Sequence, residues 1–297
     1  MSAKRINRRD FLVLGGGAAA GCAIEPGPPP DHEPAAPQSS EVVLVRSAEV
    51  LREDGTPDPV ELHRMLNEAV ARLFGEANPQ AAWRRVVSAD DVVGIKSNVW
   101  GYLPTPPALE EAIHEEVRSV GVPAEDISVD DRGVLSNPVF LRATALINVR
   151  PLRTHHWSGL GTCIKNLIMF VPRPQEYHGD ACASLGALWT LPAVAGKVRL
   201  NVLVMLTPQF HGVGAHSFSK EYVWPYGGLI VGTDPVAVDA TGARIINAKR
   251  EQYFGPGRPI TPPPHHIEIA GERYGLGVSD PERIDIIRLG PQDDALI

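Results

Sequence analysis

The stretch GLIVGTDPVAVDATG, residues 228–242, joins a buried strand to the start of a helix. Residues 228–233 are almost all apolar or small, which is typical of a strand that is covered on both faces. Asp234 is a favourable N-cap residue and Pro235 suits the first helical turn, so we expect a helix from Pro235 to about Ala248. A strand that passes directly into a helix is the repeating unit of α/β proteins.

The same alternation extends in both directions along the chain. Further strands are predicted at residues 42–46, 91–96, 126–131, 143–149 and 199–206, and in the segment RIDIIRL that ends at Leu289. Helices are predicted after the N-cap Asp58, from Thr105 to Gly121, from Cys163 to Phe170 and from His265 to Gly275. We therefore predict a single α/β domain with a mainly parallel sheet and helices on both faces, a Rossmann-like three-layer arrangement.

The N-terminus has the composition of a targeting segment. Its basic head contains Lys4, Arg5, Arg8 and Arg9, and residues 11–21 are uncharged and mostly apolar or small. The apolar part is shorter than the roughly 20 residues that span a bilayer. The stretch NRRDFLV resembles the twin-arginine signal. We predict that residues 1–22 are read by the Tat translocase and that the protein is exported, already folded, to a periplasmic or other extracytoplasmic location.

The residues that follow this segment allow two kinds of processing. Ala19-Ala20-Gly21-Cys22 is similar to a lipobox, which predicts a lipid on Cys22; the alternative is ordinary cleavage nearby. Residues 23–41 are rich in Pro, Ala, Glu and Ser, which is typical of a linker. Residues 42–297 would then form the folded domain, tethered to a membrane if Cys22 carries a lipid.

Charge and cysteine content restrict the function. The formal net charge is −7. The whole basic head lies in the signal, so the rest of the chain is more acidic still, and we expect no nucleic-acid partner. We expect no membrane-spanning segment after Cys22. Cys163 and Cys182 are either a disulfide or two buried thiols. No CxxC pattern is present, so we expect no cysteine-ligated iron–sulfur cluster.

Polar side chains follow five of the predicted strands. They are Lys96, Ser97 and Asn98; Asp130 and Asp131; Arg150, Arg153, His155 and His156; Thr207, Gln209 and His211; and Asp234. The carboxyl ends of parallel strands meet at one edge of a sheet, where ligands bind in open α/β proteins. We therefore predict one functional site at that edge.

The segment RTHHWSGLGTCIKN, residues 153–166, contains a loop of small residues that enters a helix. Backbone amides at such a turn bind anions, so we predict an anion site formed by Ser158, Gly159, Gly161, Thr162, Asn98 and Asn166. The alternative is that the glycines only allow a tight turn. The spacing differs from that of a P-loop, so nucleotide binding is not predicted.

Imidazole and carboxylate groups suggest a metal. We predict that a divalent or transition metal binds His155, His178 and His211 together with Asp131 or, alternatively, Asp239. No HExxH motif is present, and packing roles for the histidines are the alternative. Catalytic roles are predicted for Lys96, Arg153, Lys165 and Asp239, with the cations neutralising an anionic substrate. Asp239 alternatively faces water. His265 and His266 are expected to be exposed to solvent.

Several segments in order resemble one known family. VGIKSNVWG, ATALINVRPLRTHHWSGLGTCIKNLI, GLIVGTDPVAVDATG and YGLGVSDPERIDII are similar to the domain-of-unknown-function family 362, over about Glu41 to Leu289. The resemblance implies an α/β fold and a pocket formed by Lys96, Asn98, His155, Lys165, Asn166, His178, Asp234 and Asp239, but no substrate. Arg153 replaces the family's usual Lys, the region 132–143 is short, and the ferredoxin-like cysteine module of some relatives is missing.

Two functions remain open from the sequence. The first is an exported metal-dependent enzyme that acts on an anionic small molecule. The second is a binding or metal-handling module without catalysis. A hydrolase with Cys163 or Ser158 as its nucleophile is less favoured, because no base stands at a recognisable spacing from either residue.

Overall fold

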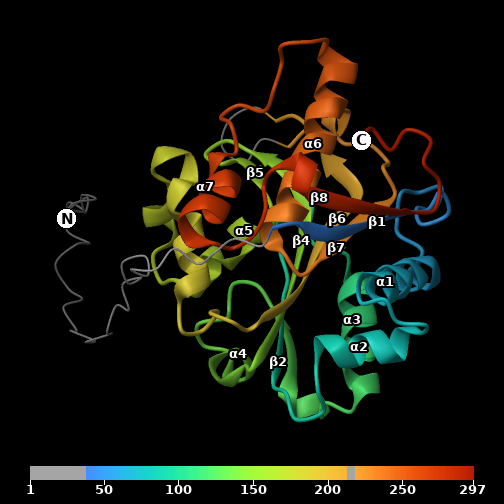
Figure 1. Ribbon diagram of the computed structural model, residues 1–297, viewed down its shortest axis with the longest axis vertical. Helices are drawn as coiled ribbons and strands as arrows, with labels where there is room; N and C mark the ends of the chain where they lie inside the picture. The colour runs from blue at the N-terminus through green and yellow to red at the C-terminus, as the bar shows by residue number, and fades with distance from the viewer. Residues whose placement is uncertain (1–37, 213–217) are drawn as a thin grey trace, which may run out of the picture.

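The computed structural model describes residues 38–212 and 218–297 (Figure 1). The twin-arginine segment, Cys22, most of the linker and His216 lie outside these residues, so the statements about them stay predictions. Cys163 and Cys182 are both free, buried thiols. None of the helices in the described part of the chain is long and apolar enough to cross a membrane.

In the described residues, one sheet of eight strands forms the centre of the protein. The strands are β1 (Ser40–Arg46), β2 (Val93–Lys96), β3 (Ile127–Asp130), β4 (Ala145–His155), β5 (Gly159–Gly161), β6 (Val198–Gln209), β7 (Gly228–Gly232) and β8 (Ile284–Leu289). Their order is β3-β2-β4-β6-β7-β1-β8, and β5 pairs with β4. Only β7 and β5 run antiparallel to their neighbours, so the prediction of a mainly parallel α/β sheet is confirmed.

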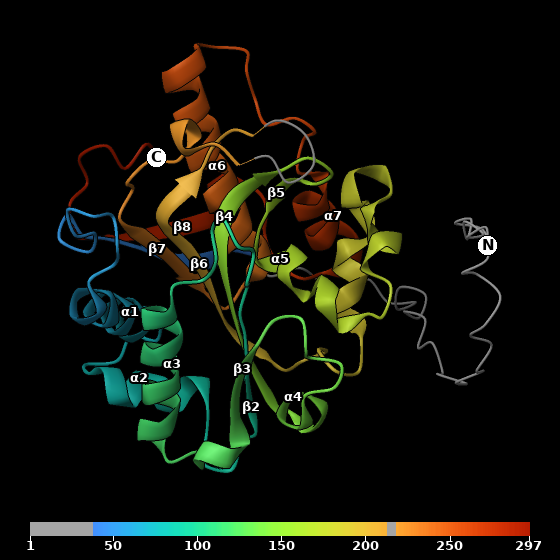
Figure 2. The ribbon, with the colours of Figure 1, turned by 180° about the vertical axis from the view of Figure 1, so that it is seen from behind.

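Helices cover both faces of this sheet (Figures 1 and 2). The α-helices are α1 (Pro59–Leu73), α2 (Pro79–Val86), α3 (Pro107–Val120), α4 (Pro138–Arg142), α5 (Cys163–Asn166), α6 (Pro235–Phe254) and α7 (His265–Tyr274). Short 3-10 helices are η1 (Ala124–Asp126), η2 (Leu167–Phe170), η3 (Pro174–His178), η4 (Asp180–Thr190), η5 (Lys220–Tyr222) and η6 (Pro281–Arg283). Helices α1, α2 and α3 pack on one face, and α5, α6, α7 and η4 pack on the other.

The pleat of β1 explains why its sequence is an uninterrupted apolar run. Val42 and Leu44 belong to the core beneath α6 and α7, whereas Val43 and Val45 belong to the core beneath α1. Successive side chains of a strand point to opposite faces, so a strand covered on both sides needs apolar residues at every position. Burial on both faces fixes β1 in the middle layer.

Side-chain caps start α1 and α6 at the aspartates that the sequence predicts. The Asp58 carboxylate accepts the amides of Val60 and Glu61 at the start of α1, both at 3.0 Å. The Asp58 amide donates to the Val50 carbonyl oxygen, and the Glu61 side chain pairs with Arg64, so Glu61 does not accept the Asp58 amide in return. Helix α2 was not predicted, because its eight residues are too short for a clear period.

The direction of β7 separates Asp234 from the predicted site. Because β7 runs against β6 and β1, its carboxyl end lies at the opposite edge of the sheet. There Asp234 caps α6 by accepting the amides of Val236 and Ala237, and it also accepts the Val278 amide at 2.9 Å. The expectation that Asp234 shares the site is therefore corrected: this carboxylate holds helix and strand ends together.

Candidate functional site

Lys96 and Asp131 form a buried ion pair at the carboxyl edge. Lys96 ends β2 and Asp131 follows β3, and these strands are parallel neighbours. The Lys96 Nζ lies 2.5 Å from Asp131 Oδ1 and 2.7 Å from the Ser97 carbonyl oxygen. Burial lowers the pKa of Lys96 to about 8, although Asp131 acts in the opposite direction. Burial would raise the pKa of Asp131, but Lys96 outweighs it and the pKa is lowered.

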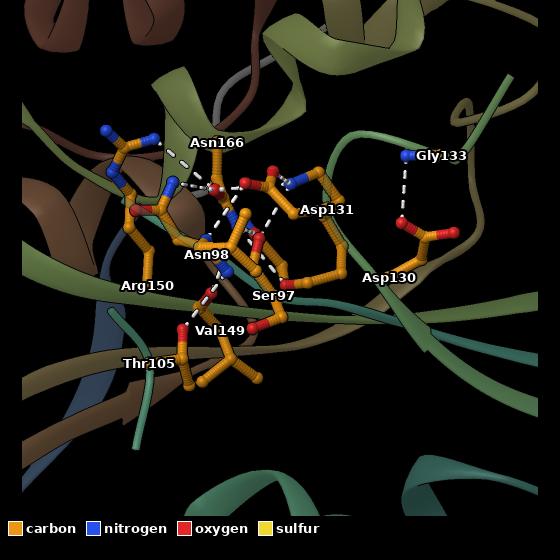
Figure 3. Close-up of polar contacts among 12 residues, drawn as sticks. Ser97, Asn98, Thr105, Asp130, Asp131, Gly133, Val149, Arg150 and Asn166 are labelled. Carbon is orange, nitrogen blue, oxygen red and sulfur yellow. Dashed lines mark hydrogen bonds and ion pairs between the residues drawn. The ribbon is translucent and has the colours of Figure 1, made fainter. Parts of the chain in front are cut away.

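Asn166, the last residue of α5, connects the end of β2 to β4 (Figure 3). Its Nδ2 donates to Asn148 Oδ1 at 2.9 Å and to the carbonyl oxygens of Val149 at 3.0 Å and Lys96 at 3.2 Å. Its Oδ1 accepts from Asn98 and Arg150 at 3.3 Å and from Lys96 at 3.4 Å. These three contacts are long, because one oxygen is shared among three donors. Asn166 is neutral, so Arg150 has no negative charge in direct contact, although Asp131 and Asp239 act on it from a longer distance.

The strand predicted at 143–149 continues to His155, so Arg150 and Arg153 project from β4 itself, beyond the end of β2. Both side chains are buried, and their Nε atoms have no hydrogen-bond partner among the described residues. No carboxylate of the described chain forms an ion pair with either. Burial lowers the pKa of both arginines, and Arg150 lowers that of Arg153 further. A guanidinium nevertheless stays charged at neutral pH.

Lys165 is a third buried cation. Its Nζ lies 3.8 Å from Cys182 Sγ, and no carboxylate within residues 38–212 or 218–297 forms an ion pair with it. Burial lowers its pKa to about 8. Burial and Lys165 also lower the pKa of His155, and they lower the pKa of His178 to about 4. The two imidazole rings, 6.1 Å apart, are therefore neutral at pH 7.

The backbone amides at the start of α5, which the small-residue loop enters, already have a partner within the chain. The Asp239 carboxylate of α6 accepts the amides of Cys163 and Ile164 at 2.9 and 2.8 Å. Thus the chain's own carboxylate caps α5, and burial raises the pKa of Asp239 to about 7. Both oxygens of Asp239 are engaged, so its role is to position α5. The anion site predicted on this backbone is corrected accordingly.

The predicted loop residues have structural partners instead. Ser158 Oγ donates to the Leu160 carbonyl oxygen at 2.6 Å, and Thr162 Oγ1 lies 3.5 Å from His266 Nε2. Gly159 has a φ of +71°, and a Cβ there would lie 2.1 Å from the Pro262 carbonyl oxygen. A Cβ at Gly161 would lie 2.6 Å from Arg150 Nη2, so this glycine makes room for the guanidinium. The loop therefore shapes the site.

The four predicted metal ligands are not gathered in one place. His155 and His178 are neighbours, but Asp131 is occupied by Lys96. His211 lies in a separate cluster, with its Nδ1 3.2 Å from Arg250 Nη1 and its ring against Tyr222. Within the part of the chain that the structure describes, no group of three or more His, Cys, Asp or Glu residues is arranged to hold a metal ion.

Three polar residues of the site were missed or misjudged. Asn148 and Asn201 face each other across β4 and β6, with Nδ2 of Asn148 donating to Oδ1 of Asn201 at 2.9 Å. An asparagine inside an otherwise apolar strand was the available signal. His266 was expected to be exposed but is fully buried, and burial together with Lys165 lowers its pKa to about 3.

The fold and the site define a class: an α/β protein with a cluster of buried cations at the carboxyl edge of its parallel strands. Within that class, the chain belongs to the family described as domain of unknown function (DUF362), whose model matches residues 54–244. No curated protein and no solved structure gives a significant match. The family match ends within α6, whereas the sheet also includes β1 and β8 outside the matched range.

Proposed function

We propose that this protein is an extracytoplasmic enzyme that binds an anionic small molecule at the carboxyl edge of its sheet. One observation carries the proposal: Arg150, Arg153 and Lys165 are buried without a carboxylate partner among the described residues. An unpaired buried charge costs several kcal/mol of folding free energy. A bound anion would supply the missing negative charge and offset that cost.

Lys165 is the best candidate for moving a proton. A lysine whose pKa is lowered to about 8 exchanges protons close to neutral pH, whereas an ordinary lysine does not. Burial and Lys165 lower the pKa values of His155 and His178, so these imidazoles do not compete with Lys165 for a proton near pH 7. Perturbed pKa values gathered in one place are characteristic of active sites. In this proposal Lys96 and Asn166 position the reacting groups, and Arg150 and Arg153 bind the anion.

A metal-dependent reaction is a second form of the proposal, supported by the neighbouring neutral imidazoles of His155 and His178. Neutral imidazole is the form that binds Zn²⁺, Ni²⁺ or Fe²⁺. A metal bound there would act as a Lewis acid on the anion. Metal analysis of protein purified through its own export route tests this idea, with the His155→Ala variant as comparison. Equal metal content in both proteins would contradict it.

The location of the protein is also a proposal, because the relevant residues precede Gln38. The pair Arg8–Arg9 and the apolar stretch support twin-arginine export, and Cys22 supports a lipid tether. Replacing both arginines by lysine should leave the protein in the cytoplasm. The Cys22→Ser variant should release an exported protein from the membrane fraction, and unchanged fractionation would remove the lipid from the proposal.

Anion binding itself can be tested without knowledge of the substrate. Sulfate and inorganic phosphate should raise the melting temperature of the wild-type protein in a concentration-dependent way. The Arg153→Met variant should weaken sulfate binding at least tenfold by calorimetry, since charge-assisted hydrogen bonds to an anion are lost. Arg84→Met is the matched control, because Arg84 is an exposed cation on α2. Equal binding by the wild type and Arg153→Met would overturn the proposal.

Binding and catalysis are separated by Lys165. A non-catalytic module would bind the anion but show no turnover, either in the wild type or in any variant. For the enzyme, Lys165→Met should abolish conversion of a substrate identified by screening anionic metabolites. A protein that binds anions through Arg153 but converts none of them would favour the binding module.

A further inference from the structure

Aromatic side chains gather beside the candidate anion site. Trp100 and Tyr102 follow β2, and Phe218 comes from the segment after β6. The ring centroids of Trp100 and Tyr102 are 5.2 Å apart, and those of Tyr102 and Phe218 are also 5.2 Å apart and stacked. These three residues, far apart in sequence, thus form one cluster.

This cluster is in direct contact with the buried cations. The Arg153 guanidinium lies over the Trp100 ring, with its Cζ 3.9 Å from the ring centroid. A cation that stacks on an aromatic ring remains positively charged and can still donate hydrogen bonds at its edge. An anion bound to Arg153 would therefore lie next to the aromatic cluster.

A fourth ring stands on the other loop of the site. Trp157 follows β4, and its ring centroid lies 4.2 Å from that of His178. Because β2 and β4 are parallel neighbours, the loops after them emerge at the same edge of the sheet. Trp100, Tyr102, Trp157 and Phe218 are named here the aromatic rim.

Apolar side chains of the aromatic rim, and one next to it, are exposed to solvent. Tyr102 is 59% exposed, Trp157 is 41% exposed, and the adjacent Val99 is 49% exposed. These are three of the seven large apolar side chains that are strongly exposed in the described chain, and all three flank the site. Exposed apolar surface bordering a polar site is typical of a ligand-binding surface.

We propose that the aromatic rim selects anions that carry a planar aromatic group, such as an aryl carboxylate, phosphate or sulfonate. The inference rests on the proposed function, because it assigns the substrate class of the same site. The charged group would bind Arg150 and Arg153, next to Lys165, and the ring would stack on Tyr102 or Trp157. Offset stacking and burial of one ring together correspond to about a tenfold gain in affinity.

Two matched pairs of probes test the inference by calorimetry: phenylphosphonate against methylphosphonate, and benzoate against acetate. Within each pair the anionic group is the same and only the ring differs. The wild-type protein should bind the aryl member of each pair about tenfold more tightly. The Tyr102→Ala and Trp157→Ala variants should lower this preference below about threefold and leave the affinity for methylphosphonate unchanged.

Tyr253→Ala is the control, because Tyr253 is an exposed tyrosine of α6 whose ring contacts involve Phe210, Tyr222 and Phe254 and no residue of the rim. It should keep the full preference for aryl probes. Methylphosphonate binding that depends on Arg153 but shows no aryl preference overturns the aromatic inference alone. Failure of all four probes to bind overturns it together with the proposed function.

Discussion

Two buried lysines of the same site have different surroundings. Burial lowers the pKa of Lys96 and of Lys165 to about the same value, near 8. Lys96 has a carboxylate 2.5 Å away and two further acceptors, so its donors are satisfied within the protein. Lys165 faces a thiol sulfur at 3.8 Å and neutral imidazoles. The difference between the two regions is charge balance, not burial.

That difference assigns the two lysines distinct roles. The region around Lys96 is a closed network in which Asp131 and Asn166 connect β2, β3 and β4 to α5. The region around Lys165 has an excess of positive charge that the described chain does not balance. A closed ion pair adds specificity to a fold, whereas an unbalanced cation lowers stability until a ligand binds.

The largest expected effect comes from breaking the ion pair between Lys96 and Asp131. Asp131→Ala leaves the Lys96 ammonium buried without its partner and removes the acceptor of the Val99 amide. We expect the free energy of unfolding at pH 7 to fall by about 3–5 kcal/mol, measured by urea denaturation. The double variant Lys96→Met/Asp131→Ala should recover much of this loss, because no unpaired charge remains. A loss below about 1 kcal/mol in the single variant would show that the buried Lys96 ammonium does not depend on Asp131 as its partner.

A smaller effect on the free energy of unfolding, of opposite sign, is expected from replacing Lys165. Lys165→Met removes a buried cation that lacks a carboxylate partner in the described residues, so the free energy of unfolding at pH 7 should rise by about 1–3 kcal/mol. The same variant should lose most of the stabilisation that sulfate gives to the wild-type protein. The matched variant Lys96→Met should instead destabilise, since Asp131 is left unpaired. Destabilisation by Lys165→Met would remove the contrast between the two regions.

The smallest effect is the pH dependence of sulfate binding, in which a comparison of the wild type with Lys165→Met separates the charge of Lys165 from that of Lys96, whose pKa is also about 8. Sulfate keeps its charge between pH 6 and 10, whereas Lys165, with its pKa lowered to about 8, loses a proton in that range. Affinity should be constant at low pH and fall by a few fold as the pH rises from 7 to 9, by calorimetry. A bound anion favours the protonated lysine, so binding above pH 8 should take up protons. Lys165→Met should flatten the profile.

Titration of Lys165 should also affect the ligand-free protein. Its stability should rise as the pH rises, whereas the affinity for sulfate should fall. The pKa of Lys165 is lower in the folded state than its ordinary value of 10.5, so the unfolded chain binds more protons between about pH 8 and 10.5. In that window Lys165 makes stability rise with pH, and below pH 8 its contribution is constant. Denaturation curves of the wild type and of Lys165→Met, compared at pH 7 and 9, should differ less at pH 9.

The sequence predicted strands, caps and helices well, because these depend on local patterns. The carboxylate of Asp58, the proline after it and the apolar run of β1 each act over a few residues. The direction of β7 was not predictable, since a strand of five residues pairs in either direction and its neighbours decide. The misplacement of Asp234 follows from that one reversal.

The candidate site was predicted in part for the same reason. Lys96 and Asp131 end parallel neighbours, so the edge rule brings them together. Asp239 could not be assigned, because its role depends on the amides of Cys163 and Ile164, which reach it only through tertiary packing. The position of Arg150 within a strand was likewise not predicted, because β4 continues past the predicted end of the strand.

The place of β1 in the sheet constrains the order of folding. β1 is the first strand of the described domain, yet its partners β7 and β8 lie near the other end of the chain, where Val43 pairs with Val231 and Ile287. Contacts of such long sequence separation form slowly and only after both segments have left the ribosome. The central part of the sheet is therefore completed only after β7 and β8 have been synthesised.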